Sequence, residues 1–305
     1  MLKPVNRDMK LSDIRLSELK FGVIINTSSG GCDSESEAEI VEILQRAGIK
    51  DCKTWCGQSD QIEQSFTQAA AHKPEVLIVL GGDGTIRTAA EACHEHGSYL
   101  IPLAGGTMNM LPRALYGDVS WQNALTNTLI DPVTRTLSGG RVADNLFFVA
   151  AVVGAAALWA ETRESLRHGD MVDAVAKSTV AFETMCDTKI QYSMSPKQTG
   201  EAEVLAVICP LVSETMLDSE QALEAAVIDV DNVSGLIGLA TAAAFGRWRE
   251  DKRVALSKTR RIAVQATKGI PLFLDGERIR IGNKAEISFV PRAADVIVPG
   301  PRNQP

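Results

Sequence analysis

The chain has 305 residues and a formal net charge of -7 at pH 7. This length predicts two domains, each with its own core, and the acidic balance argues against a nucleic-acid-binding surface, which requires clustered basic residues. The six cysteines include no C-x-x-C pair, which is typical of reduced thiols in a cytosolic protein.

The first 130 or so residues alternate strand-like and helix-like segments. Strands are predicted at residues 21–26, 51–54, 76–80 and 99–103. Helices are predicted at residues 34–47, 60–72 and 85–94, and after Thr107 and Trp121. This alternation predicts an α/β domain with a doubly wound parallel sheet, in which ligands bind beyond the carboxyl ends of the strands.

Beyond about Asp131 the pattern changes to short alternating segments, which predict a mostly β domain with helical insertions at residues 156–186 and 234–248. The predicted strands are residues 133–137, 145–153, 189–194, 204–209, 225–230, 261–266, 271–274, 278–281 and 285–290. We therefore expect domains at residues 1–131 and 132–305, with the active-site cleft between them.

Three glycine-bearing loops follow three predicted strands: residues 26–31 (NTSSGG), 81–85 (GGDGT) and 104–109 (AGGTMN). Glycines let the main chain approach a ligand closely, and helix starts offer N–H donors, so together the loops predict a polyphosphate site. Asp83 is placed to organise Mg²⁺ directly or through water. The structural alternative is a tight turn in which Asp83 or Thr85 merely caps a helix. A P-loop signature and a G-x-G-x-x-G after the first strand are absent, which argues against a P-loop ATPase and a Rossmann dehydrogenase.

A second candidate site is the segment 273–279 (FLDGERI), in which Asp275 and Glu277 flank a glycine between two predicted strands. Asp-Gly is a common hairpin turn, so a plain hairpin with solvated charges is one interpretation. The functional interpretation is a carboxylate that accepts a hydroxyl proton during phosphoryl transfer.

The order and spacing of GGDGT at 81–85, GTMN at 106–109 and the late Asp275-Gly276-Glu277 resemble the diacylglycerol kinase catalytic-domain family, which includes bacterial lipid kinases and sphingosine kinases. Residues 26–30 (NTSSG) are similar to that family's N-P-x-S-G loop, with Thr27 in place of proline. The resemblance implies an ATP- and Mg²⁺-dependent lipid kinase with a nucleotide-binding domain at 1–131 and a lipid-binding, catalytic-base domain at 132–305.

By motif position, the resemblance implies that Glu277 and Asp275 activate the lipid hydroxyl and that Asp83 serves the magnesium-phosphate centre. The nucleotide-contacting residues that it implies are Asn26, Thr27, Ser28, Ser29, Gly30, Thr54, Gly81, Gly82, Asp83, Gly84, Thr85, Gly106, Thr107 and Asn109.

Besides Thr27, the chain departs from the family pattern at three further places. Met110 stands where family members commonly have aspartate, and residues 154–157 (GAAA) lack the acid of a G-F-D-A segment. The stretch that usually bears a magnesium-binding loop is shortened to residues 209–223, where Asp218 is the one remnant that could bind the metal.

The acceptor implied is a membrane lipid with a free hydroxyl: diacylglycerol, ceramide, a sphingoid base or another lipid alcohol. Two other functions stay open: an NAD kinase, which shares the GGDGT loop, and a catalytically silent nucleotide- or lipid-binding regulator. The first 20 residues do not read as a signal peptide, and the longest apolar run, residues 146–160, is shorter than the ~20 residues that span a bilayer. We therefore expect a cytoplasmic protein, peripheral at the inner face of the membrane, that could form a homodimer through edge strands.

Overall fold

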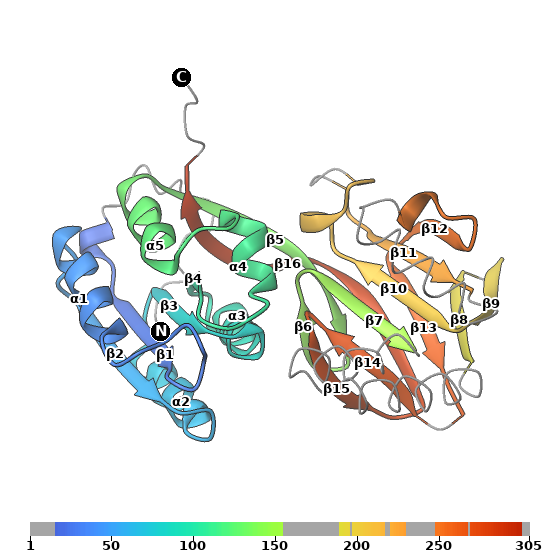
Figure 1. Cartoon of the computed structure of the whole chain (residues 1–305), viewed down its shortest axis with the longest axis horizontal. Helices are drawn as coiled ribbons and strands as arrows, with labels where there is room; N and C mark the ends of the chain where they lie inside the picture. The colour runs from blue at the N-terminus through green and yellow to red at the C-terminus, as the bar shows by residue number, and fades with distance from the viewer. Residues whose placement is uncertain are drawn as a thin grey trace, which may run out of the picture. The chain divides into compact units, whose positions relative to one another are not determined.

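The computed structural model describes residues 16–154, 189–195, 197–216, 220–229, 248–267 and 269–300. The chain divides into two compact units, unit 1 (Met1–Ser138 with Pro291–Pro305) and unit 2 (Gly139–Val290) (Figure 1). This division differs from the expected domains, residues 1–131 and 132–305, because the chain returns to unit 1 at its C-terminal end. The strand β16 (Lys284–Pro299) makes this return.

Unit 1 is an α/β unit whose sheet has the strand order β2-β1-β3-β4-β16, with parallel pairing throughout. Its elements are η2 (Leu16–Glu18), β1 (Phe21–Asn26), α1 (Ser36–Arg46), β2 (Cys52–Gly57), α2 (Ile62–His72), β3 (Val76–Gly81), α3 (Asp83–His96), β4 (Tyr99–Ala104), α4 (Met110–Tyr116), α5 (Trp121–Ile130) and the first part of β5 (Pro132–Val142). Every residue of β1 and β3 is buried, as expected for parallel strands that are covered on both faces. Alternate residues of β1, β3 and β4 pack against α1 and α5, while α2 and α3 contact β1, β3 and β4.

Unit 2 is mostly β and has two layers of strands. One sheet runs β12-β11-β10-β7-β14-β15, and the other layer contains β16-β13-β8-β9, all with antiparallel pairing. Its elements are β6 (Asn145–Phe147), β7 (Ala150–Gly154), β8 (Ile190–Ser195), β9 (Gln198–Ala202), β10 (Val204–Ile208), η3 (Pro210–Val212), β11 (Leu223–Ile228), η4 (Trp248–Glu250), β12 (Val254–Thr259), β13 (Arg261–Gln265), β14 (Ile270–Leu274) and β15 (Glu277–Ile281). Apolar residues of both layers, such as Val153, Leu205, Ile262 and Leu272, form one buried core. The predicted fold class, an α/β domain with a parallel sheet followed by a mostly β domain, is confirmed.

Several element boundaries differ from the prediction. The expected strand 145–153 is two strands, β6 and β7, because the chain turns at Phe148 and Val149. The strands β9 (QTGEA) and β12 (VALSKT) were not predicted, because they are short and rich in polar or small residues and lie at sheet ends. The predicted helical insertions at 156–186 and 234–248 fall almost entirely outside the described residues.

Candidate active site

The three predicted glycine loops follow β1, β3 and β4, which are adjacent strands of the parallel sheet in unit 1 (Figure 1). The register pairs Gly81 at the end of β3 with Ala104 at the end of β4, so the loops that follow begin side by side. The sheet therefore brings the three loops together at its carboxyl edge, where α/β sheets bind ligands.

Backbone hydrogen bonds join the loops to one another. The Gly31 N–H donates to the Gly105 carbonyl over 2.8 Å, and the Gly105 N–H donates to the Gly81 carbonyl over 2.9 Å. The Gly82 N–H donates to Ser29 Oγ over 3.1 Å. A Cβ on residue 105 would lie 2.8 Å from the Gly81 nitrogen, and one on residue 106 would lie 2.6 Å from Gly82 Cα. Glycine is required at both positions because the backbones of two loops touch there.

Asn26 and Thr85 lie beneath the loops and hold them in place. The Asn26 Nδ2 donates to Thr85 Oγ1 over 2.9 Å, and the Ser28 N–H donates to Asn26 Oδ1 over 3.1 Å. Both side chains are buried, whereas Thr27, Ser28, Gly30 and Thr107 are exposed. The exposed residues are the ones that a ligand can reach without a rearrangement.

Asp83 holds the beginning of α4. Its Oδ2 accepts the Asn109 N–H over 2.9 Å, and its Oδ1 accepts the Met110 N–H over 2.6 Å. A carboxylate is favoured there because the N–H groups at a helix start lack intrahelical partners. Asp83 is thus a capping residue, as the structural alternative proposed, although the helix that it caps is α4 and not its own helix α3.

Asn109 closes the third loop from the other side. Its Oδ1 accepts the Gly106 N–H over 2.8 Å, and its Nδ2 donates to the Gly106 carbonyl over 2.9 Å. Asn109 has a φ of 51°, a left-handed conformation that asparagine tolerates better than most residues. Asp83, Gly106 and Asn109 therefore form one bonded set, although the sequence alone does not show that they touch.

The second strand ends later than predicted, and this changes the position of Thr54. The strand β2 continues to Gly57, and Thr54 pairs with Val23 in the middle of that strand. Thr54 is therefore not at the carboxyl edge. The residues that reach the loops are Gly57, whose carbonyl accepts the Thr27 N–H over 2.9 Å, and Ser59, whose N–H donates to Ser28 Oγ over 3.1 Å. Gly57 followed by polar residues was the available signal for this contact.

The cysteines near these loops have raised thiol pKa values, which makes them poor nucleophiles. Burial, together with Asp33, raises the pKa of the Cys32 thiol to about 11. Partial desolvation and the neighbouring Glu37 carboxylate raise the pKa of the Cys56 thiol to about 12. Both thiols stay protonated at neutral pH, so the chemistry of this edge rests on backbone N–H groups, hydroxyls and Asp83.

In unit 2, Asp275 and Gly276 form the turn between β14 and β15, with φ values of 47° and 86°. Positive φ at both positions is typical of a two-residue hairpin turn, so the hairpin is confirmed. The Asp275 charge, however, is not solvated, because the residue is 4% exposed. Its Oδ2 accepts the Phe148 N–H over 2.7 Å, and its Oδ1 accepts the Val149 and Ala150 N–H groups over 2.8 and 2.9 Å.

Glu277 differs from Asp275 in its surroundings. It is the first residue of β15, and its side chain is exposed. Of the two carboxylates in the hairpin, Glu277 is the one that a substrate can reach, while Asp275 fixes the turn on β7. The residues that sequence reasoning missed here, Phe148 and Val149, act through backbone N–H groups and left no side-chain signal.

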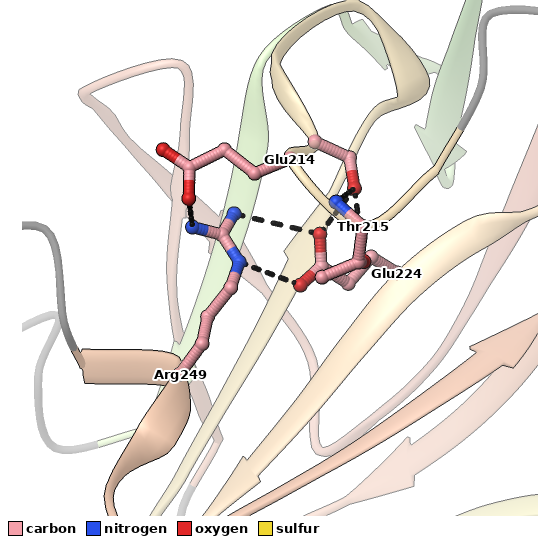
Figure 2. Close-up of polar contacts among 5 residues, drawn as sticks. Glu214, Thr215, Glu224 and Arg249 are labelled. Atoms are coloured by element: carbon pink, nitrogen blue, oxygen red, sulfur yellow. Dashed lines mark hydrogen bonds and ion pairs between the residues drawn. The ribbon is translucent and has the colours of Figure 1, made fainter.

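The predicted metal ligand Asp218 lies outside the described residues. Among the described residues on either side of it in the sequence, Glu214 and Glu224 both accept hydrogen bonds from Arg249 (Figure 2). Arg249 Nε donates to Glu224 Oε1 over 2.9 Å, and Arg249 Nη1 donates to Glu214 Oε2 over 3.0 Å. Within the described parts of the chain, no group of three or more His, Cys, Asp or Glu side chains could hold a metal ion.

A single carboxylate at the loops fits a nucleotide-bound Mg²⁺ better than a cage made only of protein ligands. Mg²⁺ keeps several waters and commonly takes one or two carboxylates together with substrate phosphates. Asp83 is that carboxylate, and its two oxygens each accept one backbone N–H group. Among the helices that the structure describes, none is long and apolar enough to cross a membrane.

Comparison with known proteins agrees with this geometry. Residues 20–142 match the model of the diacylglycerol kinase catalytic domain, and this range contains all three loops. A solved structure of a diacylglycerol kinase from Bacillus anthracis str. Sterne is similar, with a TM-score of 0.65 and 14% identity over 92% of this chain and 97% of that chain.

Another structure, of a protein from Bacillus anthracis str. Sterne that is provisionally assigned as a diacylglycerol kinase, has a TM-score of 0.70 and 17% identity over 92% of this chain and 97% of that chain. At these identities the structures show a shared fold, and the match at 20–142 supplies the family. Residues 20–142 therefore contain a diacylglycerol kinase catalytic domain, the domain of a family of lipid kinases.

Proposed function

We propose that the protein transfers the γ-phosphate of ATP, with Mg²⁺, to the hydroxyl of a membrane lipid, diacylglycerol or a related lipid alcohol such as ceramide or a sphingoid base. The observation that carries the proposal is the bonded set of three loops at the carboxyl edge of the unit 1 sheet. Phosphoryl transfer requires little covalent chemistry from the protein, so positioned N–H groups and fixed charges account for most of the catalysis.

In this proposal the three loops bind the nucleotide. The exposed hydroxyls of Thr27, Ser28 and Thr107 and the N–H groups of Gly30 and Gly84 contact the phosphates. Asn26, Thr85 and Asn109 hold the loops in shape from below. A bound Mg²⁺ would neutralise charge on the phosphates, and Asp83 is the carboxylate that would hold it, directly or through water.

Glu277 is our candidate for the general base that accepts the proton of the lipid hydroxyl. Its exposure leaves both carboxylate oxygens accessible to a substrate, and the turn that Asp275 fixes sets its position. Asp275, whose oxygens already accept three backbone N–H groups, is a positioning residue in this scheme and not a base.

The test is phosphate transfer from γ-labelled ATP with Mg²⁺ to diacylglycerol, ceramide or sphingosine in mixed micelles, compared with NAD in solution. We expect label in a lipid product, and we expect Glu277→Gln to reduce transfer by about 100-fold or more while ATP affinity is unchanged. The matched control is Glu201→Gln, an exposed glutamate of β9 in the same unit. Glu277 is a cleaner target than Asp83, because replacing Asp83 also removes the cap of α4.

Label in NADP would identify an NAD kinase instead, and ATP binding without any transfer would identify a silent regulator. A lipid acceptor also requires peripheral contact with the membrane, at its inner face for a cytoplasmic enzyme. Cosedimentation measures this contact when vesicles that contain the lipid acceptor are compared with vesicles that lack it.

A further inference from the structure

The described loops at the carboxyl edge of the unit 1 sheet carry no Lys or Arg side chain. The sequence has no Lys or Arg in residues 26–36, 57–61, 81–86 or 104–110, whereas Asp33, Glu35, Asp60 and Asp83 are acidic. A polyphosphate carries several negative charges, so Mg²⁺ and backbone N–H groups alone would have to offset both the ligand and these carboxylates.

The first cation after the GGDGT loop is Arg87, in the second turn of α3. It follows Asp83 by four residues, so the two side chains share one face of the helix and their Cβ atoms are about 6 Å apart. Long helical side chains point back toward the helix N-terminus, which directs Arg87 over the turn that begins at Asp83.

The guanidinium of Arg87 has an unsatisfied donor. Its Nη1 is buried and has no hydrogen-bond partner within the part of the chain that the structure describes. Buried polar groups in proteins nearly always have a hydrogen-bond partner. A buried donor without a partner in the protein therefore indicates a missing partner, such as a bound ion or ligand. The next arginine along the chain, Arg113 of α4, already faces Asp118 with its Nη2 3.7 Å from Oδ1.

We propose that Arg87 donates hydrogen bonds to phosphate oxygens of the bound nucleotide, as the cation of the three-loop site. The inference rests on the proposed nucleotide site of unit 1. The Arg87 side chain is half-buried, so it can turn toward a ligand. Because its Nη1 makes no hydrogen bond, none is broken at that atom when the side chain turns. Side-chain rotations of this kind are common on binding, and a planar guanidinium suits phosphate because it presents paired donors.

The test is titration calorimetry of the full-length protein with Mg²⁺–ATP and, separately, with inorganic tripolyphosphate. We expect Arg87→Gln to weaken both ligands by about tenfold or more, since charge-assisted hydrogen bonds are lost. Arg87→Lys should lie between the wild type and Arg87→Gln, because it keeps the charge and loses the paired donors. The matched control Arg113→Gln removes an arginine from the neighbouring helix and should stay within about twofold of wild type.

Wild-type affinity in Arg87→Gln would overturn the inference, and so would an equal loss in Arg113→Gln, which would indicate only general electrostatics. A wild-type protein that bound neither ligand would overturn the inference together with the proposed function. Arg87-dependent ATP binding without transfer to any lipid would refute the proposed function and support the inference.

A second measurement avoids substitution and therefore does not depend on the folding of a variant. Tripolyphosphate should protect Arg87 of the wild-type protein from an arginine-selective dicarbonyl reagent, as followed by mass spectrometry of the peptide that contains it. Modification of Arg87 at the same rate with and without saturating ligand would contradict the proposal.

Discussion

At the scale of single residues, three carboxylates that resemble catalytic groups in the sequence have different surroundings in the structure. Asp83 accepts two backbone N–H groups, Asp275 accepts three, and Glu277 is exposed. Carboxylates that accept several N–H groups hold their neighbours in place, and they leave fewer lone pairs for a substrate. Within the short motif 275–277, burial and hydrogen bonding thus separate Asp275, which fixes the turn, from Glu277, the proposed general base.

Asp275→Asn tests this division. The amide cannot accept at its nitrogen, so at least one of the Phe148, Val149 and Ala150 N–H groups loses its partner. We expect the free energy of unfolding to fall by about 3 kcal/mol, since each hydrogen bond to a charged group contributes roughly 1.5–3 kcal/mol. Urea unfolding measures the loss, and Asp144→Asn, at an exposed position of the same unit, is the control with an expected change within about 0.5 kcal/mol. If the Asp275→Asn protein were inactive yet as stable as the wild type, Asp275 would act on the substrate directly.

At the scale of elements, the ion-paired group of Figure 2 joins three segments of unit 2: the residues after η3, the strand β11 and the turn η4. Glu224 of β11 is 1% exposed, and it accepts from Arg249 and from the Ser213 hydroxyl. A buried carboxylate needs such partners because desolvation alone would disfavour its charge strongly. Arg249 also lies over the Trp248 ring, 4.5 Å from its centroid, which restricts the guanidinium further.

Removing both Glu224 and Arg249 should cost less than the sum of the two single removals. Arg249→Met leaves Glu224 buried without its cation, and we expect a loss of about 3–5 kcal/mol in the free energy of unfolding. In the double variant Glu224→Met/Arg249→Met, we expect a smaller loss than the sum of the two single losses. Urea unfolding of all four proteins gives the coupling energy. The control is Lys258→Met, which breaks a more exposed ion pair with Glu220 and should cost about 1 kcal/mol or less. Additive losses at Glu224 and Arg249 would show that the pair does not act as a unit.

The sequence predicts the elements of unit 1 well because long apolar runs and glycine-rich turns are local signals. β1 has the predicted bounds, and the runs at β3 and β4 place the second and third loops correctly. The contacts that the sequence does not predict join residues that are far apart in the chain. The Asp83 carboxylate meets N–H groups at positions 109 and 110, and Asp275 meets N–H groups at 148 to 150. Backbone donors carry no residue type, so no pattern of side chains marks them.

At the scale of the whole molecule, the chain crosses between the two units twice, through β5 and through β16. The prediction ended the last strand at Val290 because Pro291 and Arg292 interrupt its apolar pattern. In the structure, β16 pairs with β13 up to Ser288 and with β4 at Val296, so the proline stands between two partners. Proline lacks an N–H group and is tolerated where a ladder is interrupted. Homodimer formation through edge strands stays a prediction, for which sedimentation equilibrium is the measurement.

The returning end of β16 should be essential to unit 1, although it lies far from the other strands of that unit in the sequence. Residues 293–298 include five buried side chains, Ala293, Ala294, Val296, Ile297 and Val298, and Ile297 belongs to the unit 1 core. The Gly300 N–H donates to the Asp131 carbonyl over 2.7 Å, and Thr136 Oγ1 donates to Asp295 Oδ1 over 2.6 Å, so this segment also fixes β5.

A chain truncated after Val290 would expose one side of β4 and lose these buried residues. Burial of one large aliphatic side chain contributes about 1.5–3 kcal/mol to the free energy of unfolding. Three such side chains are lost from β16, Val296, Ile297 and Val298, and their combined contribution approaches the total stability of many domains. We therefore expect native-state hydrogen exchange to show lost protection in β3 and β4 of the truncated protein, with protection retained in β10 and β11. The matched control is truncation after Gly300, which removes only the residues beyond β16. Equal protection of β4 in both truncated proteins would show that unit 1 folds without its returning strand.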